Sequence, residues 1–105
     1  MATRLPTLFI SHGSPTFAIE PGIAGPALTA LGKTLPRPTA ILIVSPHWTT
    51  REPRVAITLR PQTIHDFGGF PQELYQVRYP APGGPALARR VQELLAPLPV
   101  MLDES

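Results

Sequence analysis

The chain has 105 residues, no cysteine and a formal net charge of +2, which excludes disulfides, thiolate metal sites and cysteine nucleophiles. Nucleic-acid binding usually requires a clustered basic face, and the only adjacent basic pair is Arg89-Arg90, so we expect no nucleic-acid partner. The longest aliphatic run, residues 40–44, is far shorter than the ~20 residues that span a bilayer. We therefore expect no membrane insertion and a cytoplasmic protein.

The first half of the chain predicts two strands with a helix between them. Residues 8–10 (LFI) form a short apolar run, which predicts a buried strand that ends in a polar loop at residues 11–15 (SHGSP). A weak helix follows, because apolar residues recur on one face at Ile23, Ala27, Leu28, Leu31 and Leu35. Residues 39–44 (TAILIV) are wholly apolar and β-branched, which is typical of a strand covered on both faces in a parallel sheet.

The second half predicts a long loop within further α/β structure. Residues 54–59 (RVAITL) alternate and predict a third strand, whereas residues 60–84 read as irregular backbone too long for a simple connector. A helix begins near Pro85 and stops before Pro97, and residues 99–102 (PVML) predict a fourth strand. This order indicates an α/β protein with a mostly parallel or mixed sheet and flanking helices.

The three histidines lie in loops, and two of them occupy equivalent positions. His12 follows the first predicted strand and His47 follows the second. If these strands are parallel neighbours, both imidazoles emerge at the same sheet edge, where α/β proteins collect their ligands. Histidine is the commonest metal ligand, so the pair predicts part of a metal site. The alternative is that each is an ordinary turn residue.

Three motifs carry a resemblance to a known family. Residues 11–15 (SHGSP), 45–48 (SPHW) and 64–71 (IHDFGGFP) are similar to motifs of the DODA-type extradiol dioxygenases, relatives of the class III, LigB-like ring-cleaving enzymes. The segment around residues 79–83 (YPAPG) continues this similarity, which extends over essentially the whole chain. Family members are much longer, so we expect residues 1–105 to be the N-terminal portion of a single, truncated catalytic domain with a partial LigB-like α/β fold.

The resemblance implies an activity and a set of site residues. The parent enzyme would open a catechol-type aromatic ring, DOPA-like or related, with dioxygen at a non-haem metal held by His12 and His47. Iron(II) is the metal expected for turnover, and zinc(II) is a possible occupant that cannot change oxidation state. The partners would be a small aromatic diol and dioxygen, and the oligomeric state is open. The fragment alone is expected to be inactive.

The remaining site assignments leave alternatives open. His65 is assigned to acid–base chemistry or substrate binding, with a structural turn role as the alternative. Asp66 either orients His65, binds substrate or caps a turn. Trp48 lines an aromatic pocket or closes the end of the core, and Tyr79 supplies stacking surface for the substrate. The competing functions are a zinc-dependent hydrolase, disfavoured because no HExxH helix is present, and an inactive fragment or binding module of the same fold.

Overall fold

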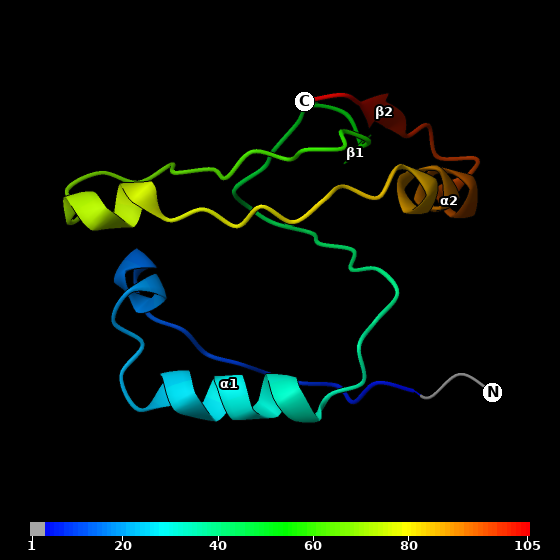
Figure 1. The fold of residues 1–105 in the computed structure, drawn as a ribbon. Coiled ribbons are helices and arrows are strands. Elements are labelled where there is room, and N and C mark those ends of the chain that lie inside the picture. The colour runs from blue at the N-terminus through cyan, green and yellow to red at the C-terminus, as the bar shows by residue number, and fades with distance from the viewer. Residues whose placement is uncertain (1–3) are drawn as a thin grey trace. The chain divides into compact units, whose positions relative to one another are not determined.

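The computed structural model describes residues 4–105, and the chain divides into two compact units (Figure 1). The first unit contains Met1–Thr39 and Phe67–Val77, and the second contains Ala40–Asp66 and Arg78–Ser105. The long segment at residues 60–84 is therefore shared, because its middle part belongs to the first unit and its two ends belong to the second.

The predicted helix in the first unit is confirmed as α1, Ala24–Thr34. It ends at Leu35, whose extended backbone (φ −76°, ψ 142°) is the conformation that a following proline favours. The Thr34 hydroxyl donates to the Leu31 carbonyl oxygen at 2.8 Å and satisfies one acceptor of the last turn.

Two short 3-10 helices complete the first unit: η1, Pro15–Ala18, and η2, Gln72–Gln76, which contact each other. Leu74 of η2 is only 3% exposed and is a buried apolar residue of the first unit. The interpretation of residues 60–84 as wholly irregular was wrong at η2. The aromatic side chains around η2 pack on one another, with ring-centroid distances of 5.4 Å for Phe67–Phe70 and 5.0 Å for Phe67–Tyr75.

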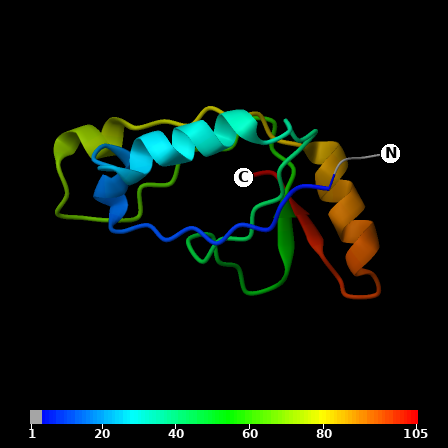
Figure 2. The same cartoon turned by 90° about the horizontal axis from the view of Figure 1, so that it is seen from below.

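The second unit is a βαβ arrangement (Figure 2). Strand β1, Arg54–Ala56, pairs in parallel with β2, Met101–Asp103, and helix α2, Pro85–Leu95, lies between them in the sequence. Backbone hydrogen bonds extend the pairing by one residue, because the Ile57 amide donates to the Asp103 carbonyl oxygen at 2.7 Å. This crossover is the connection that parallel strands require.

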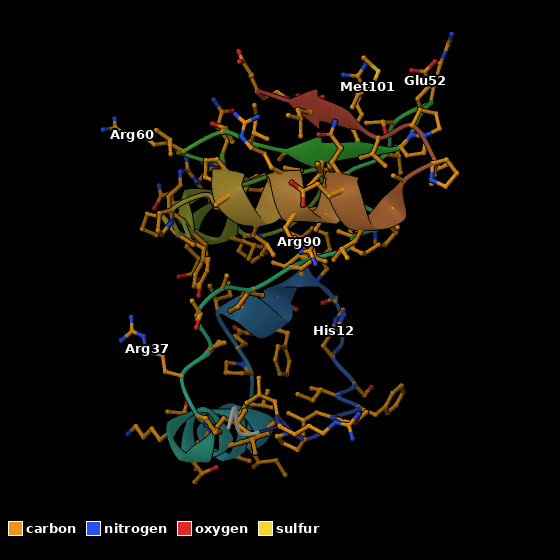
Figure 3. The ribbon with its side chains drawn as sticks, turned by 90° about the vertical axis from the view of Figure 1, so that its right-hand side faces the viewer. His12, Arg37, Glu52, Arg60, Arg90 and Met101 are labelled. Carbon is orange, nitrogen blue, oxygen red and sulfur yellow. The ribbon has the colours of Figure 1, made fainter. Side chains whose placement is uncertain are left out.

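Helix α2 packs on both strands of the second unit and contains one of its buried apolar residues. It begins with Pro85 at its first turn, a position where the missing amide hydrogen costs nothing. Ala88 is 3% exposed and Val100, just before β2, is 7% exposed. The Gln92 side chain donates to the Val100 carbonyl oxygen at 2.7 Å, which ties the helix to the chain entering β2. Figure 3 shows α2 along one face of the two strands.

Two predicted strands are absent from the described residues 4–105. Residues 8–10 and 39–44 have no strand pairing there, and their side chains are exposed, for example 98% for Phe9 and 93% for Val44. An apolar run forms a strand only when a neighbouring strand accepts its backbone hydrogen bonds, and neither segment has such a neighbour in the described chain. The other two strands exist but are shorter than predicted, since β1 stops at Ala56 and β2 begins at Met101.

The expected fold class is confirmed at the level of a partial α/β fold, with a parallel two-stranded sheet and flanking helices. Among residues 4–105, no helix is both long enough and apolar enough to cross a membrane.

Candidate functional site

His47 lies on a turn whose backbone is fixed by the preceding serine. The Ser45 hydroxyl oxygen accepts the His47 amide at 3.1 Å, and the Ser45 carbonyl oxygen accepts the Trp48 amide at 3.5 Å. Serine at the first position and Pro46 at the second are the residues that favour such a turn. The sequence therefore determines how the backbone presents the imidazole.

The His47 ring is held by Asp66, which lies 19 residues further along the same unit. His47 Nδ1 is 2.7 Å from Asp66 Oδ2. The hydrogen bond from His47 is the main reason that the pKa of Asp66 lies below its ordinary value of 3.8. At neutral pH Asp66 is therefore an ionised carboxylate, which only accepts hydrogen bonds. His47 must donate through Nδ1, so its Nε2 carries the lone pair when the ring is neutral.

The neutral His12 ring has the same tautomer as His47, but a different hydrogen-bond partner determines it. Its Nδ1 is 2.8 Å from the Gly13 carbonyl oxygen, which is only an acceptor, so Nδ1 carries the hydrogen and Nε2 the lone pair. The ring is exposed and lies in the segment that leads into η1 (Figure 3). Metal-binding histidines characteristically donate one ring N–H to a carbonyl or carboxylate and coordinate through the other nitrogen.

His12 belongs to the first unit and His47 to the second, so their convergence on one ion stays a prediction. Within residues 4–105, no group of three or more His, Cys, Asp or Glu side chains lies together as a candidate metal cluster. His12 and His47 each have the Nε2 lone pair of the neutral ring available, and their role as metal ligands stays a prediction.

His65 has a different environment from the other two histidines. Its Nε2 lies 3.1 Å from Arg78 Nη1. Arginine is only a donor, so His65 accepts at Nε2 and carries its hydrogen on Nδ1. The lone pair that a metal or a transferred proton would use is engaged by Arg78, and proton transfer at this nitrogen requires Arg78 to move. No pattern in the sequence predicts the Arg78 contact.

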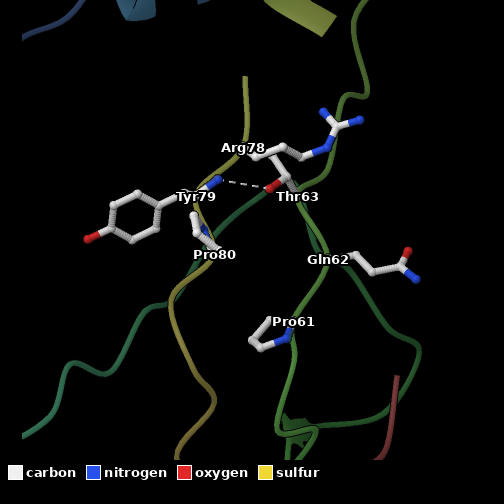
Figure 4. A pocket seen from close by; sticks show the side chains of 6 residues that line it. All are labelled: Pro61, Gln62, Thr63, Arg78, Tyr79 and Pro80. Atoms are coloured by element: carbon white, nitrogen blue, oxygen red, sulfur yellow. Dashed lines mark hydrogen bonds between the residues drawn. The ribbon is translucent and has the colours of Figure 1, made fainter. Parts of the chain in front are cut away.

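A groove of about 430 Å³ lies beside this contact in the second unit (Figure 4). The Tyr79 amide donates to the Thr63 hydroxyl oxygen at 3.2 Å and joins the two chain segments that form the walls. The lining mixes ring surfaces with a guanidinium, an amide and a hydroxyl, and consists of Pro61, Gln62, Thr63, Arg78, Tyr79 and Pro80. Tyr79, one of the predicted substrate residues, thus lines a groove, and its substrate-binding role stays a prediction.

Two other predicted residues are located as follows. Asp66 was linked in the sequence to its neighbour His65, whereas the structure brings its carboxylate to His47. A contact across 19 residues has no periodic signature and could not be found by spacing. Trp48 is 37% exposed at the turn beside His47, and neither of its predicted roles is tested.

The fold and these motifs correspond to a known class of protein. Residues 6–103 match the family model described as the catalytic LigB subunit of aromatic ring-opening dioxygenase. The chain therefore belongs to the LigB family, and the resemblance inferred from its three motifs is confirmed.

The names of the curated relatives are more specific than the description of the family model. The chain is 56% identical over 103 residues to a 4,5-DOPA dioxygenase extradiol of Escherichia coli (strain K12), a match that covers 98% of this chain and 38% of the relative. It is 44% identical over 93 residues to a 4,5-DOPA dioxygenase extradiol of Beta vulgaris, with coverages of 86% and 35%. It is 32% identical over 94 residues to dioxygenase tasH of Hapsidospora irregularis, with coverages of 79% and 29%. The chain thus spans between a quarter and two fifths of the length of these relatives.

Proposed function

We propose that this chain contributes the metal-binding histidines of an extradiol dioxygenase that opens a catechol-type ring, with a DOPA-like compound as the substrate class. The observation that carries the proposal is the family match over residues 6–103, which includes all three histidine motifs. In the reaction, the ring carbon–carbon bond beside one hydroxyl breaks, and both atoms of dioxygen enter the product, which carries an aldehyde and a carboxylate. Cytoplasmic location is part of the same proposal.

The chemistry of the histidines supports a metal at this site. His12 and His47 each donate Nδ1–H to an oxygen acceptor, at 2.8 Å and 2.7 Å, so each has its lone pair on Nε2. We propose that these two nitrogens are the ligands that this chain supplies. Iron(II) is the proposed metal for turnover, with zinc(II) as a possible occupant. When bound, iron(II) supplies open coordination positions for the diol and dioxygen and a path for electrons between them.

We assign substrate binding to the groove and to Trp48, and proton transfer to His65, which contacts the groove residue Arg78. Such a substrate needs an apolar wall with a few polar groups to orient it. We propose that Tyr79 and Pro80 provide the wall and that Trp48 adds aromatic surface beside His47. We further propose that His65 Nε2 accepts a proton from the phenol, which requires Arg78 to leave its place 3.1 Å from that nitrogen.

Oxygen uptake by the full-length protein tests this function. The iron-loaded protein is mixed with L-DOPA in an oxygen electrode while the ring-opened product is followed by absorbance. We expect one dioxygen consumed for each ring opened, and we expect His47→Ala to abolish both signals. A protein that binds iron but consumes no oxygen with any catechol would support the alternative of an inactive binding module.

A further inference from the structure

We propose that Asp66 is the positioning residue for His47: its carboxylate holds the imidazole by Nδ1–H and thereby fixes Nε2 as the metal-binding nitrogen. This inference rests on the proposed metal role of His47. It gives Asp66 a different task from substrate binding or from the orientation of His65.

The geometry of the pair carries the first step. The 2.7 Å separation between His47 Nδ1 and Asp66 Oδ2 is a short, charge-assisted hydrogen bond. A neutral imidazole in water exchanges between two tautomers, and only the one with hydrogen on Nδ1 can donate to this carboxylate. Asp66 therefore selects the tautomer that leaves Nε2 able to coordinate an ion.

The turn around His47 explains why a second residue is needed. Ser45 fixes the backbone through its contact with the His47 amide at 3.1 Å, but this bond places no restriction on the two side-chain torsions of His47. Those torsions retain several staggered or broad minima in an exposed residue. The bond to Asp66 selects one of them, so Ser45 positions the backbone and Asp66 positions the ring.

Exposure argues against a mainly structural purpose. The His47 and Asp66 side chains are 68% and 45% exposed, and ion pairs this open to water contribute little to the stability of a fold. Second-sphere carboxylates act on the metal instead, and their removal typically lowers metal affinity by about 10- to 100-fold. The expected consequence of losing Asp66 is therefore weak metal binding by a protein that remains folded.

The test compares metal affinity and ring tautomer in the full-length protein. Zinc dissociation constants are measured by competition with a chromophoric chelator for wild type, Asp66→Ala, Asp66→Asn and His47→Ala. Asp103→Ala is the matched control, because Asp103 is also a hydrogen-bonded carboxylate of the second unit but contacts Arg54 and Ser105. Nitrogen NMR of the metal-free proteins reports which nitrogen of His47 carries the hydrogen, and thermal melting reports folding.

We expect Asp66→Ala to bind zinc about 10- to 100-fold more weakly than wild type and to populate both His47 tautomers. Asp66→Asn keeps an acceptor oxygen but loses the charge, so its affinity should lie between those two values. Asp103→Ala should keep wild-type affinity. If zinc affinity depends on His47 but Asp66→Ala stays within twofold of wild type, the positioning role is wrong and the proposed metal site stands. If His47→Ala has no effect on affinity, the metal site itself is wrong.

Discussion

Replacing Gly83 by alanine should destabilise the second unit at the point where two of its segments cross. The Gly83 amide donates to the Leu59 carbonyl oxygen at 3.0 Å. A methyl carbon at Gly83 would overlap the Thr58 carbonyl oxygen and lie 2.9 Å from the Thr58 carbonyl carbon. Both neighbours are backbone atoms, so no side-chain rotation relieves the overlap and the two segments must separate.

The size of the effect is the sum of a lost hydrogen bond and a steric penalty. Breaking the Gly83–Leu59 hydrogen bond costs about 0.5–1.5 kcal/mol. Forcing the packed segments apart costs about 1–3 kcal/mol, the usual penalty for overpacking. We therefore expect Gly83→Ala to lower the free energy of unfolding by about 1.5–4.5 kcal/mol. The same crossing holds residues 61–63 near residues 78–80, so the KM for substrate should rise as well.

Urea titration of the full-length protein, followed by circular dichroism, measures this loss. Gly32→Ala is the matched control, because Gly32 lies within α1 and no atom lies within 4 Å of an added methyl carbon there. The control should gain about 0.5–1 kcal/mol from its better helix propensity. An unfolding free energy of Gly83→Ala within about 0.5 kcal/mol of wild type, the range of a neutral surface change, would refute the steric reasoning.

Three further predictions concern charge, catalysis and the isolated chain. The pKa of Asp103 is lowered mainly by hydrogen bonds from Ser105 and also by Arg54, so its stabilising effect should be complete above the ordinary pKa of 3.8 and be lost as the pH falls through the lower pKa of the folded protein. Asp103→Asn should therefore melt at a lower temperature than wild type at pH 6 and at the same temperature below the pKa of the folded protein. A difference in melting temperature that does not change with pH would contradict this. His65→Ala should greatly reduce turnover while metal content and melting temperature stay nearly constant, and a variant that loses stability but keeps its turnover per folded molecule would make His65 structural. The isolated 105-residue chain should bind iron(II) or zinc(II) weakly and show little dioxygenase activity, because two histidines leave an ion under-coordinated, whereas brisk oxygen uptake by this chain would contradict that reasoning.

The elements that the sequence predicted correctly are those specified by local chemistry. Helix α1 ends before Pro36 and helix α2 begins at Pro85, because proline acts on its own backbone and on the residue before it. The sequence also predicted the strands that became β1 and β2, but not that these two pair with each other.

The strands that the sequence predicted wrongly are those for which composition favoured a strand but no partner strand lies beside the segment within residues 4–105. Residues 39–44 have the strongest strand composition in the sequence but no ladder partner within residues 4–105, so they form no strand there. Composition describes what a segment can do, whereas the hydrogen bonds of a strand depend on a second segment.

In the candidate site, likewise, the histidines were predicted from their neighbours in the sequence, whereas their side-chain contacts were not. His12 and His47 were found from their places after two apolar runs. The contacts that fix their tautomers were not predicted. Every residue has a backbone carbonyl oxygen, so the sequence does not single out the one that His12 contacts, and Asp66 lies 19 residues from His47. Arg78 was missed for the same reason, since it lies 13 positions from His65 and the whole of η2 lies between them.

A crystal structure of the full-length protein loaded with iron(II) or zinc(II) would show directly whether His12 and His47 share a metal ion. We expect one ion bound by Nε2 of His12 and Nε2 of His47, each about 2.0–2.1 Å away, so that the two nitrogens lie roughly 3–4 Å apart. Asp66 should remain on Nδ1 of His47. An ion held by other residues, with the His12 and His47 rings at opposite edges of the sheet, would show that these two histidines do not form the metal site.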